Sequence, residues 1–325
     1  MAKVKNFKTI FPAVSVPLND DYSINEPEFR AYLRWIKTFY GKGMDGLVCN
    51  GHTGEITGLT RAERKRVVEI CAEECGDVMT IISGVNCENT AESIEMAKEA
   101  KEAGADGILL MPPHMWLRFG MNPDAPFEYV KDVAEGADID IIIHLYPATS
   151  KAFYPVETLI KMCKEIDHVK CIKMGTRVTS IYEHDVRLLR QECPDISLIT
   201  CHDETLCVSW FPGMDGALIG FAGCVPEIIC PAREVFANPD KHTLKEAQDW
   251  SDRIYHISQA IYGGGQPSGE AHARLKEALK QRGIFKSALM RKPVLPLNQE
   301  EKDWVALGLE RSQLPEVDMT QFEDK

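Results

Sequence analysis

The chain has 325 residues, of which 44% are hydrophobic and 26% charged, as is typical of soluble globular proteins. Its formal net charge of −12 argues against a nucleic acid or an anionic membrane as partner. No run of about 18 apolar residues occurs, so the sequence predicts no membrane-spanning helix. Residues 1–7 lack an apolar core of signal-peptide length, and the 11 cysteines contain no Cys-x-x-Cys pair. Both features predict a cytoplasmic protein with reduced thiols.

Short apolar segments alternate with amphipathic ones along most of the chain. They are mostly apolar throughout, as expected for parallel strands covered on both faces. We predict eight strands, over residues 13–16, 46–50, 80–84, 107–111, 139–145, 171–174, 197–201 and 217–220. Eight strand–helix units fit a closed (β/α)₈ barrel. A doubly wound dinucleotide-binding sheet lacks support, because no Gly-x-Gly-x-x-Gly follows the first strand.

Three helix starts carry a capping-box pattern or its Asn variant, at Thr60 with Glu63, Asn89 with Glu92, and Ser180 with Glu183. Beyond residue 240 the strand signals stop, and amphipathic stretches predict helices over residues 242–261, 269–282 and 299–311. We therefore predict a barrel catalytic domain at residues 1–240. A C-terminal helical bundle with an acidic tail is expected at residues 241–325.

A single lysine, Lys173, ends the apolar stretch that begins at Val169, and a Gly-Thr pair follows it. Burial disfavours the ammonium form of lysine, so a buried lysine can become a free amine that attacks carbonyl carbons. The alternative interpretation is an ordinary lysine at a strand end, held in a salt bridge.

Four of the nine histidines fall at predicted strand ends, where (β/α)₈ barrels carry their chemistry: His52, His114, His144 and His202. The turn at residues 51–55, Gly-His-Thr-Gly-Glu, combines backbone N–H groups with the Thr53 hydroxyl and suits a small carboxylate. It can equally be a tight structural turn. His144 and Tyr146 share one face of their strand, so either can move protons beside Lys173.

Three motifs together resemble the dihydrodipicolinate synthase and N-acetylneuraminate lyase superfamily. They are the 51–55 turn with the following Leu-Thr, the Lys173 strand, and Met-Arg-Lys-Pro-Val-Leu-Pro-Leu at residues 290–297. The resemblance implies a barrel with a C-terminal helical bundle, assembled as a homotetramer or homodimer. It implies a Schiff base between Lys173 and pyruvate or another 2-oxo acid, with no metal or organic cofactor. Thr53 and the backbone at residues 52–53 would hold the substrate carboxylate, and Gly51 and His52 are expected among the substrate-binding residues.

Departures from the family pattern narrow the range of reactions that we expect. Alignment on Pro147 puts His144 where the family has its proton-relay tyrosine, so Tyr146 or His144 takes that role. His52 replaces a Thr or Ser. The arginine that synthases carry after this proline is absent, because Ala-Thr-Ser occupies residues 148–150. Dihydrodipicolinate synthase activity itself is therefore not expected.

Two features point to different aldehyde partners. The phrase Pro-His-Met-Trp at residues 113–116 is similar to the Pro-Met-Trp of aromatic hydratase-aldolases, with Trp116 and Phe221 as flat walls. This is the preferred interpretation, with His114 and Gly220 as further substrate-binding residues. Asp203 and Glu204 match the acidic pair of sialic acid lyases, which indicates a sugar-acid lyase or dehydratase instead. The same pair can simply be favoured by a helix N-terminus.

The residues alone leave two other classes of protein possible. One is a metal-dependent barrel hydrolase with His52, His144, His202 and Asp203 as ligands, because imidazole and carboxylate groups suit zinc. The other is a non-catalytic relative that binds a small acid.

Overall fold

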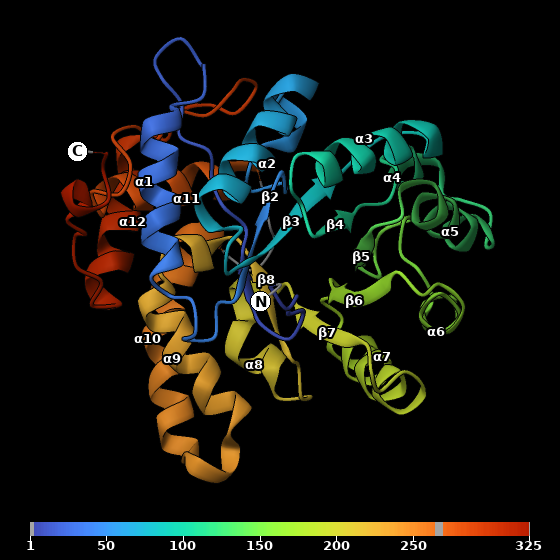
Figure 1. Ribbon diagram of the computed structural model, residues 1–325. Coiled ribbons are helices and arrows are strands. Elements are labelled where there is room, and N and C mark those ends of the chain that lie inside the picture. The colour runs from blue at the N-terminus through green and yellow to red at the C-terminus, as the bar shows by residue number, and fades with distance from the viewer. Residues whose placement is uncertain (1–2, 264–268, 325) are drawn as a thin grey trace.

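The computed structural model describes residues 3–263 and 269–324, and its centre is a barrel of eight parallel strands surrounded by helices (Figure 1). Neighbouring strands follow the order β1-β8-β7-β6-β5-β4-β3-β2. They are β1 (Ile10–Pro12), β2 (Gly46–Cys49), β3 (Thr80–Val85), β4 (Gly107–Leu110), β5 (Asp140–His144), β6 (Val169–Met174), β7 (Ser197–Thr200) and β8 (Gly216–Ile219). The predicted (β/α)₈ barrel is confirmed.

The first strand lies at residues 10–12, so its predicted position at residues 13–16 is wrong. β1 pairs with β8 over its whole length. Its pairing with β2 consists of individual hydrogen bonds. The N–H groups of Ile10 and Val14 donate to carbonyls in and just before β2, each at 2.9 Å. Pro12 lies between them and has no N–H to donate. The proline therefore interrupts the ladder where the barrel closes.

Helices follow the strands and cover the outside of the barrel. They are α1 (Glu26–Lys37), α2 (Arg61–Cys75), α3 (Thr90–Glu102), α4 (Met115–Phe119), α5 (Ala125–Ala137), α6 (Val156–Glu165), α7 (Thr179–Glu192), α8 (Leu206–Trp210) and α9 (Pro226–Ala237). Thr60 caps α2 in a full capping box, and the Asn89 side chain caps α3. The cap predicted at Ser180 is wrong, because α7 begins at Thr179 and Val178, two residues before Ser180, occupies the cap position.

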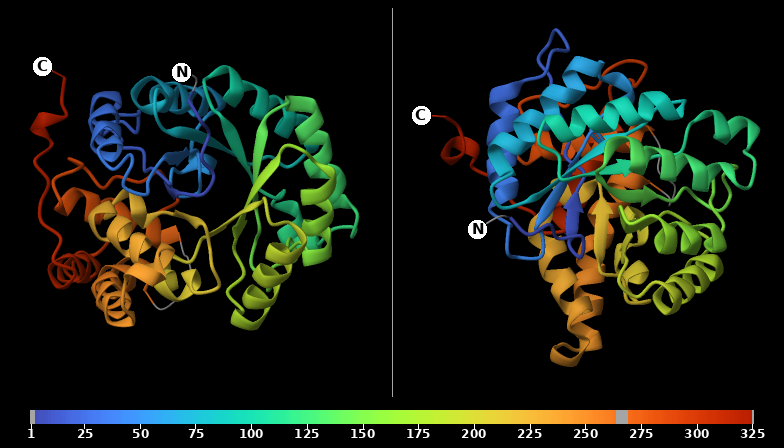
Figure 2. Two further views of the ribbon diagram at one scale, coloured as in Figure 1. Left: turned by 60° about the horizontal axis from the view of Figure 1, so that its bottom comes forward. Right: turned by 45° about the vertical axis from the view of Figure 1, so that its right-hand side comes forward.

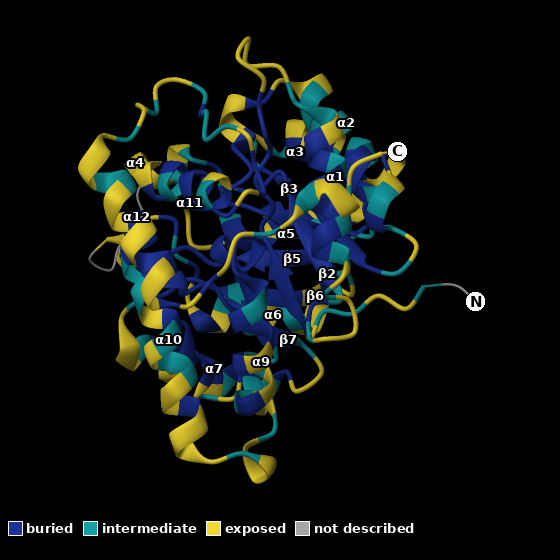
Figure 3. Cartoon of the chain, turned by 90° about the vertical axis from the view of Figure 1, so that its left-hand side faces the viewer, coloured by how far each residue is buried: buried dark blue, intermediate teal, exposed yellow. Residues whose placement is uncertain are grey.

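The barrel separates two apolar cores. Figure 3 shows that buried residues gather at the centre of the molecule. A large core fills the layer between strands and helices. A smaller one fills the barrel interior with alternate strand residues, among them Val48, Leu109, Ile142, Cys171 and Leu218. Both faces of each strand are therefore buried, which explains why the strands are apolar throughout.

Three C-terminal helices, α10 (Leu244–Tyr262), α11 (Gly269–Gln281) and α12 (Gln299–Arg311), gather on one side of the barrel (Figure 2). α10 packs against α9, and α12 packs against both α10 and α11. The acidic tail returns to α1, where Arg34 donates to the Phe322 carbonyl at 3.0 Å. In the described residues no helix is both long and apolar enough to cross a membrane. The division of the chain at residue 240 stays a prediction.

A buried ion pair joins the C-terminal helices to the barrel. Lys276 on α11 contacts Glu55 in the loop after β2, and the two side chains are 2% and 8% exposed. We expect Lys276→Met to lower the free energy of unfolding by about 3–5 kcal/mol, because it leaves the Glu55 carboxylate buried without its cation. Denaturant titration measures this change in the free energy of unfolding. The double variant Lys276→Met/Glu55→Gln should recover much of the loss, and equal stability of the single and double variants would contradict the argument.

Candidate active site

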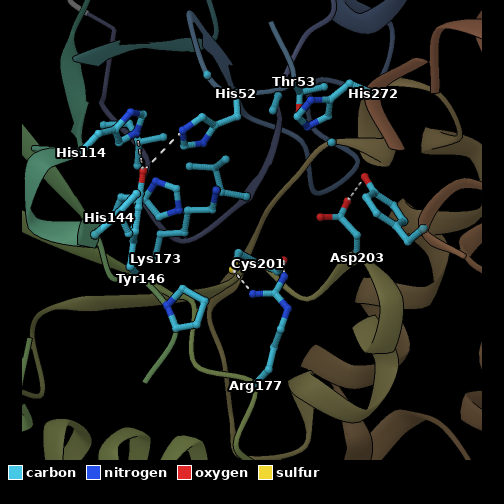
Figure 4. Close-up of a pocket in the computed structure, with 18 residues that line it drawn as sticks. His52, Thr53, His114, His144, Tyr146, Lys173, Arg177, Cys201, Asp203 and His272 are labelled. Atoms are coloured by element: carbon cyan, nitrogen blue, oxygen red, sulfur yellow. Dashed lines mark hydrogen bonds between the residues drawn. The ribbon is translucent and has the colours of Figure 1, made fainter. Parts of the chain in front are cut away.

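A cavity of about 390 Å³ lies at the carboxyl ends of the strands. Its floor is the top of the barrel core, formed by Ala13, Leu109 and Leu218. Most of its wall side chains carry polar groups, and they come from the strand ends and the C-terminal helices (Figure 4). They comprise Gly51, His52, Thr53, His114, Leu117, His144, Tyr146, Pro147, Lys173, Arg177, Cys201, Asp203, Gly220, Tyr262 and His272.

Lys173 reaches this cavity from the end of β6. Cys171 belongs to the barrel interior, and side chains two residues apart on a strand share a face, so Lys173 also points inward. Within residues 3–263 and 269–324, no side chain forms a hydrogen bond or ion pair with its amine. Burial lowers the pKa of Lys173 below its ordinary value, opposed by nearby Cys201 and Asp203. The amine is therefore suited to nucleophilic attack rather than to a salt bridge.

Four rings stand together near Lys173: His52, His114, His144 and Tyr146 (Figure 4). The Tyr146 hydroxyl is hydrogen-bonded to Nε2 of His114 at 3.3 Å and to Nε2 of His52 at 3.4 Å. The His144 ring meets the Tyr146 ring edge-on, with 4.9 Å between the centroids. A hydroxyl can donate to one imidazole and accept from the other, so this cluster can pass protons.

Two histidines of the cluster, His52 and His144, are held in their neutral form. Burial, followed by the charge of Lys173, lowers the pKa of His52 to about 3 and holds the pKa of His144 well below its usual range. Burial raises the pKa of Tyr146, so its hydroxyl keeps its proton at neutral pH. His144 also has a buried Nδ1 with no hydrogen-bond partner in the part of the chain that is described.

The turn at residues 51–55 lines the cavity with Gly51, His52 and Thr53. The N–H of Glu55 donates to the His52 carbonyl at 3.0 Å, which closes the turn. The N–H groups of His52 and Thr53 donate to no acceptor among the described residues. Gly220 approaches closely, since a Cβ there would lie 2.9 Å from Thr53 Oγ1 and 2.8 Å from the Tyr262 hydroxyl. Only glycine fits without displacing them.

Asp203, which follows β7, lies across the cavity from the four rings (Figure 4). The Tyr262 hydroxyl and the Phe221 N–H donate to its Oδ1, at 2.8 and 3.1 Å. Burial raises the pKa of Asp203 to about 6, against the effect of these hydrogen bonds. Since both bonds end on Oδ1, the other carboxylate oxygen is the one left for a ligand.

Arg177 enters the cavity wall from the loop after β6. Its guanidinium forms an ion pair with Glu204 and donates to the Gly175 carbonyl at 3.0 Å and the Cys201 carbonyl at 3.4 Å. Its charge helps to lower the pKa of Lys173. The sequence analysis did not include Arg177, although it lies only four residues after Lys173.

Three residues predicted for substrate binding do not line this cavity. Trp116 packs edge-on against Tyr129 and Tyr154, so the neighbouring Leu117 reaches the cavity instead. Phe221 is fully buried, and Glu204 turns away to Arg177 beside a groove between α7 and α8. The flat aromatic walls expected from Trp116 and Phe221 are thus replaced by polar groups.

The C-terminal helices supply two wall residues that sequence reasoning missed, Tyr262 from α10 and His272 from α11. Cys201 was also missed as a wall residue. Neither Tyr262 nor His272 lies in a motif, and both are about 90–100 residues from Lys173 along the chain. No sequence signal placed them at the barrel mouth.

The ligand set of the metal hypothesis does not assemble. Across residues 3–263 and 269–324, no three His, Cys, Asp or Glu side chains are grouped so that they could hold a metal ion. His202 lies instead beside Tyr182, with 4.7 Å between the ring centroids, next to the groove between α7 and α8.

Comparisons with known proteins agree with this geometry. Residues 6–311 match the model of the dihydrodipicolinate synthetase family. The chain is 26% identical to the 4-hydroxy-tetrahydrodipicolinate synthase of Bartonella bacilliformis, over 94% of this chain and 98% of that one. It is 25% identical to an uncharacterized DapA-like lyase of Thermofilum pendens, over 89% and 92% of the two chains.

Solved structures show the same fold at low sequence identity. YagE from E. coli K12, a member of this family solved in complex with pyruvate, matches with a TM-score of 0.84 and 21% identity, over 95% of this chain and 99% of that one. Dihydrodipicolinate synthase from Aquifex aeolicus matches with a TM-score of 0.83 and 19% identity, over 96% and 100%. The chain therefore belongs to the dihydrodipicolinate synthetase family and is an enzyme of its class I aldolase and lyase type.

Proposed function

We propose that this enzyme forms an imine between Lys173 and the ketone of a pyruvate-derived 2-oxo acid, and that it makes or breaks the bond between C3 and C4. The observation that carries the proposal is the unpaired, desolvated amine of Lys173 in a polar cavity. Family membership supports it, as does the pyruvate bound in the YagE relative.

The reaction would begin when the Lys173 nitrogen attacks C2. The ketone oxygen takes up protons and leaves as water, and an iminium remains. In the cleavage direction, the C3–C4 electron pair moves into the iminium while the C4 hydroxyl loses its proton and becomes the aldehyde. The resulting enamine takes a proton at C3, and hydrolysis releases pyruvate and the free amine.

We assign the proton transfers to Tyr146 rather than to His144. The Tyr146 hydroxyl is protonated and hydrogen-bonded to two imidazoles, which can restore its proton after each transfer. Thr53 Oγ1 and the free N–H groups of His52 and Thr53 would bind the substrate carboxylate.

The polar lining favours an oxygen-rich aldehyde partner, as in a sugar-acid lyase or dehydratase. Asp203 leaves one carboxylate oxygen for a hydroxyl, and Arg177 and His114 add donors on other sides of the cavity. An aromatic or bulky aldehyde is the second candidate. It is favoured by α4, where Leu117 meets the cavity and Met115 and Phe119 are exposed.

Borohydride trapping tests the imine. The protein is incubated with pyruvate, reduced, and analysed by intact-mass and peptide mass spectrometry. We expect one reduced pyruvyl adduct, on Lys173. A folded protein that gives no adduct with pyruvate or with larger 2-oxo acids would overturn the proposal and favour a non-catalytic acid-binding protein. Cleavage assays with a 2-keto-3-deoxy sugar acid and with a benzylidenepyruvate then separate the two partner classes.

A further inference from the structure

One C-terminal side chain, His272 on α11, lines the catalytic cavity, where Figure 4 shows it next to Thr53. Within the described ranges its ring forms no hydrogen bond or ion pair. It lies close enough to Lys173 and Glu55 for both charges to act on it, and close enough to His52 to affect that ring in turn. A histidine that served only packing would be expected to satisfy its ring nitrogens with protein partners.

The helix that carries His272 is fixed to the turn at residues 51–55. Lys276 lies four residues after His272, on the same face of α11. Its ammonium binds Glu55 Oε1 and donates to the Leu289 carbonyl at 2.9 Å. The second Glu55 oxygen accepts the Arg291 N–H at 3.0 Å. The buried ion pair of Lys276 and Glu55 therefore fixes the position of His272 relative to the turn.

We propose that His272 binds the carboxylate of the 2-oxo acid as a neutral hydrogen-bond donor, so that α11 completes the carboxylate site begun by Thr53 and the 51–55 turn. This assignment rests on the proposed function. His272 lines the same cavity as Thr53 and Lys173, and Figure 4 shows it next to Thr53, at the end of the cavity where the substrate carboxylate would bind. Burial lowers the pKa of His272 to about 4, so near pH 7 the ring holds one N–H and adds no charge beside the amine.

The test measures how the yield of borohydride-trapped adduct depends on pyruvate concentration. We expect His272→Leu to raise the half-saturating concentration about tenfold or more, since a hydrogen bond to a charged group is lost. The yield at saturation should be unchanged, because Lys173 is intact. His272→Gln keeps an N–H donor and should recover most of the affinity. His184→Leu on α7 is the matched control, because that side chain is 66% exposed and outside the cavity.

The outcomes separate this inference from the proposed function. A wild-type protein that traps no 2-oxo acid overturns both. A wild type that traps pyruvate, with His272→Leu saturating at the same concentration, overturns the carboxylate role alone. A weaker His272→Leu that His272→Gln does not rescue, or that shows a lowered melting temperature, would mark His272 as a packing residue and also overturn it.

Discussion

Replacing Lys173 by alanine is expected to lower turnover at least about a thousandfold, because no other described residue that lines the cavity has an amine that can form the imine. The same variant should give no borohydride adduct. It should keep the wild-type melting temperature within a few degrees, since a desolvated amine without a partner contributes little stability. Turnover with the aldehyde partner found by screening, adduct mass and thermal unfolding measure the three effects.

Lys170→Ala is the matched control, because Lys170 lies on the same strand but is exposed and donates to the Asp167 carbonyl. It should retain wild-type activity. Retention of about a tenth of the rate by Lys173→Ala would contradict an obligatory imine. The pH dependence gives an independent check, since only the free amine attacks. Activity should rise with pH through the pKa of Lys173, and this rise should lie below pH 10.5 because burial lowers that pKa.

The barrel could be predicted from local patterns because each strand is short, apolar and followed by an amphipathic segment. The error at the first strand has a local cause. The predicted range began directly after Pro12, whereas the proline is tolerated as the last residue of β1, where the missing N–H costs one hydrogen bond to β2. Thr53, His144 and Tyr146, proposed from their places at strand ends, line the cavity together with Lys173, because the barrel itself brings the strand ends together.

The remaining wall residues depend on contacts between distant parts of the chain. Trp116 was expected in the cavity, but one turn of α4 directs it onto Tyr129 and Tyr154. His272 and Tyr262 enter only because α10 and α11 pack against the barrel, partly through the buried pair of Glu55 and Lys276. Pairings between residues about 220 positions apart leave no periodic pattern in the sequence.

Tyr146→Phe is expected to lower turnover about 10²- to 10⁴-fold, the usual contribution of a positioned acid–base group. The substitution removes the hydroxyl that bonds to His52 and His114 but keeps the ring that packs against His144. His144→Phe should have a much smaller effect, because its imidazole has no hydrogen-bond partner in the described residues at Nδ1. Steady-state kinetics on the two variants, with the adduct yield as a check on Lys173, measure the difference.

The pH dependence of turnover distinguishes Tyr146 from His144 as the proton shuttle, independently of the rates of the two variants. If Tyr146 acts, no titration of His144 should govern the rate near neutral pH, because burial holds the pKa of His144 well below its ordinary value. Asp203, with its pKa raised to about 6, can add its own titration step to the pH profile near that pH. Asp203→Asn keeps the Oδ1 acceptor and should remove that step. A step that survives Asp203→Asn but disappears in His144→Phe would instead make His144 the shuttle, because only its titration would then govern the rate.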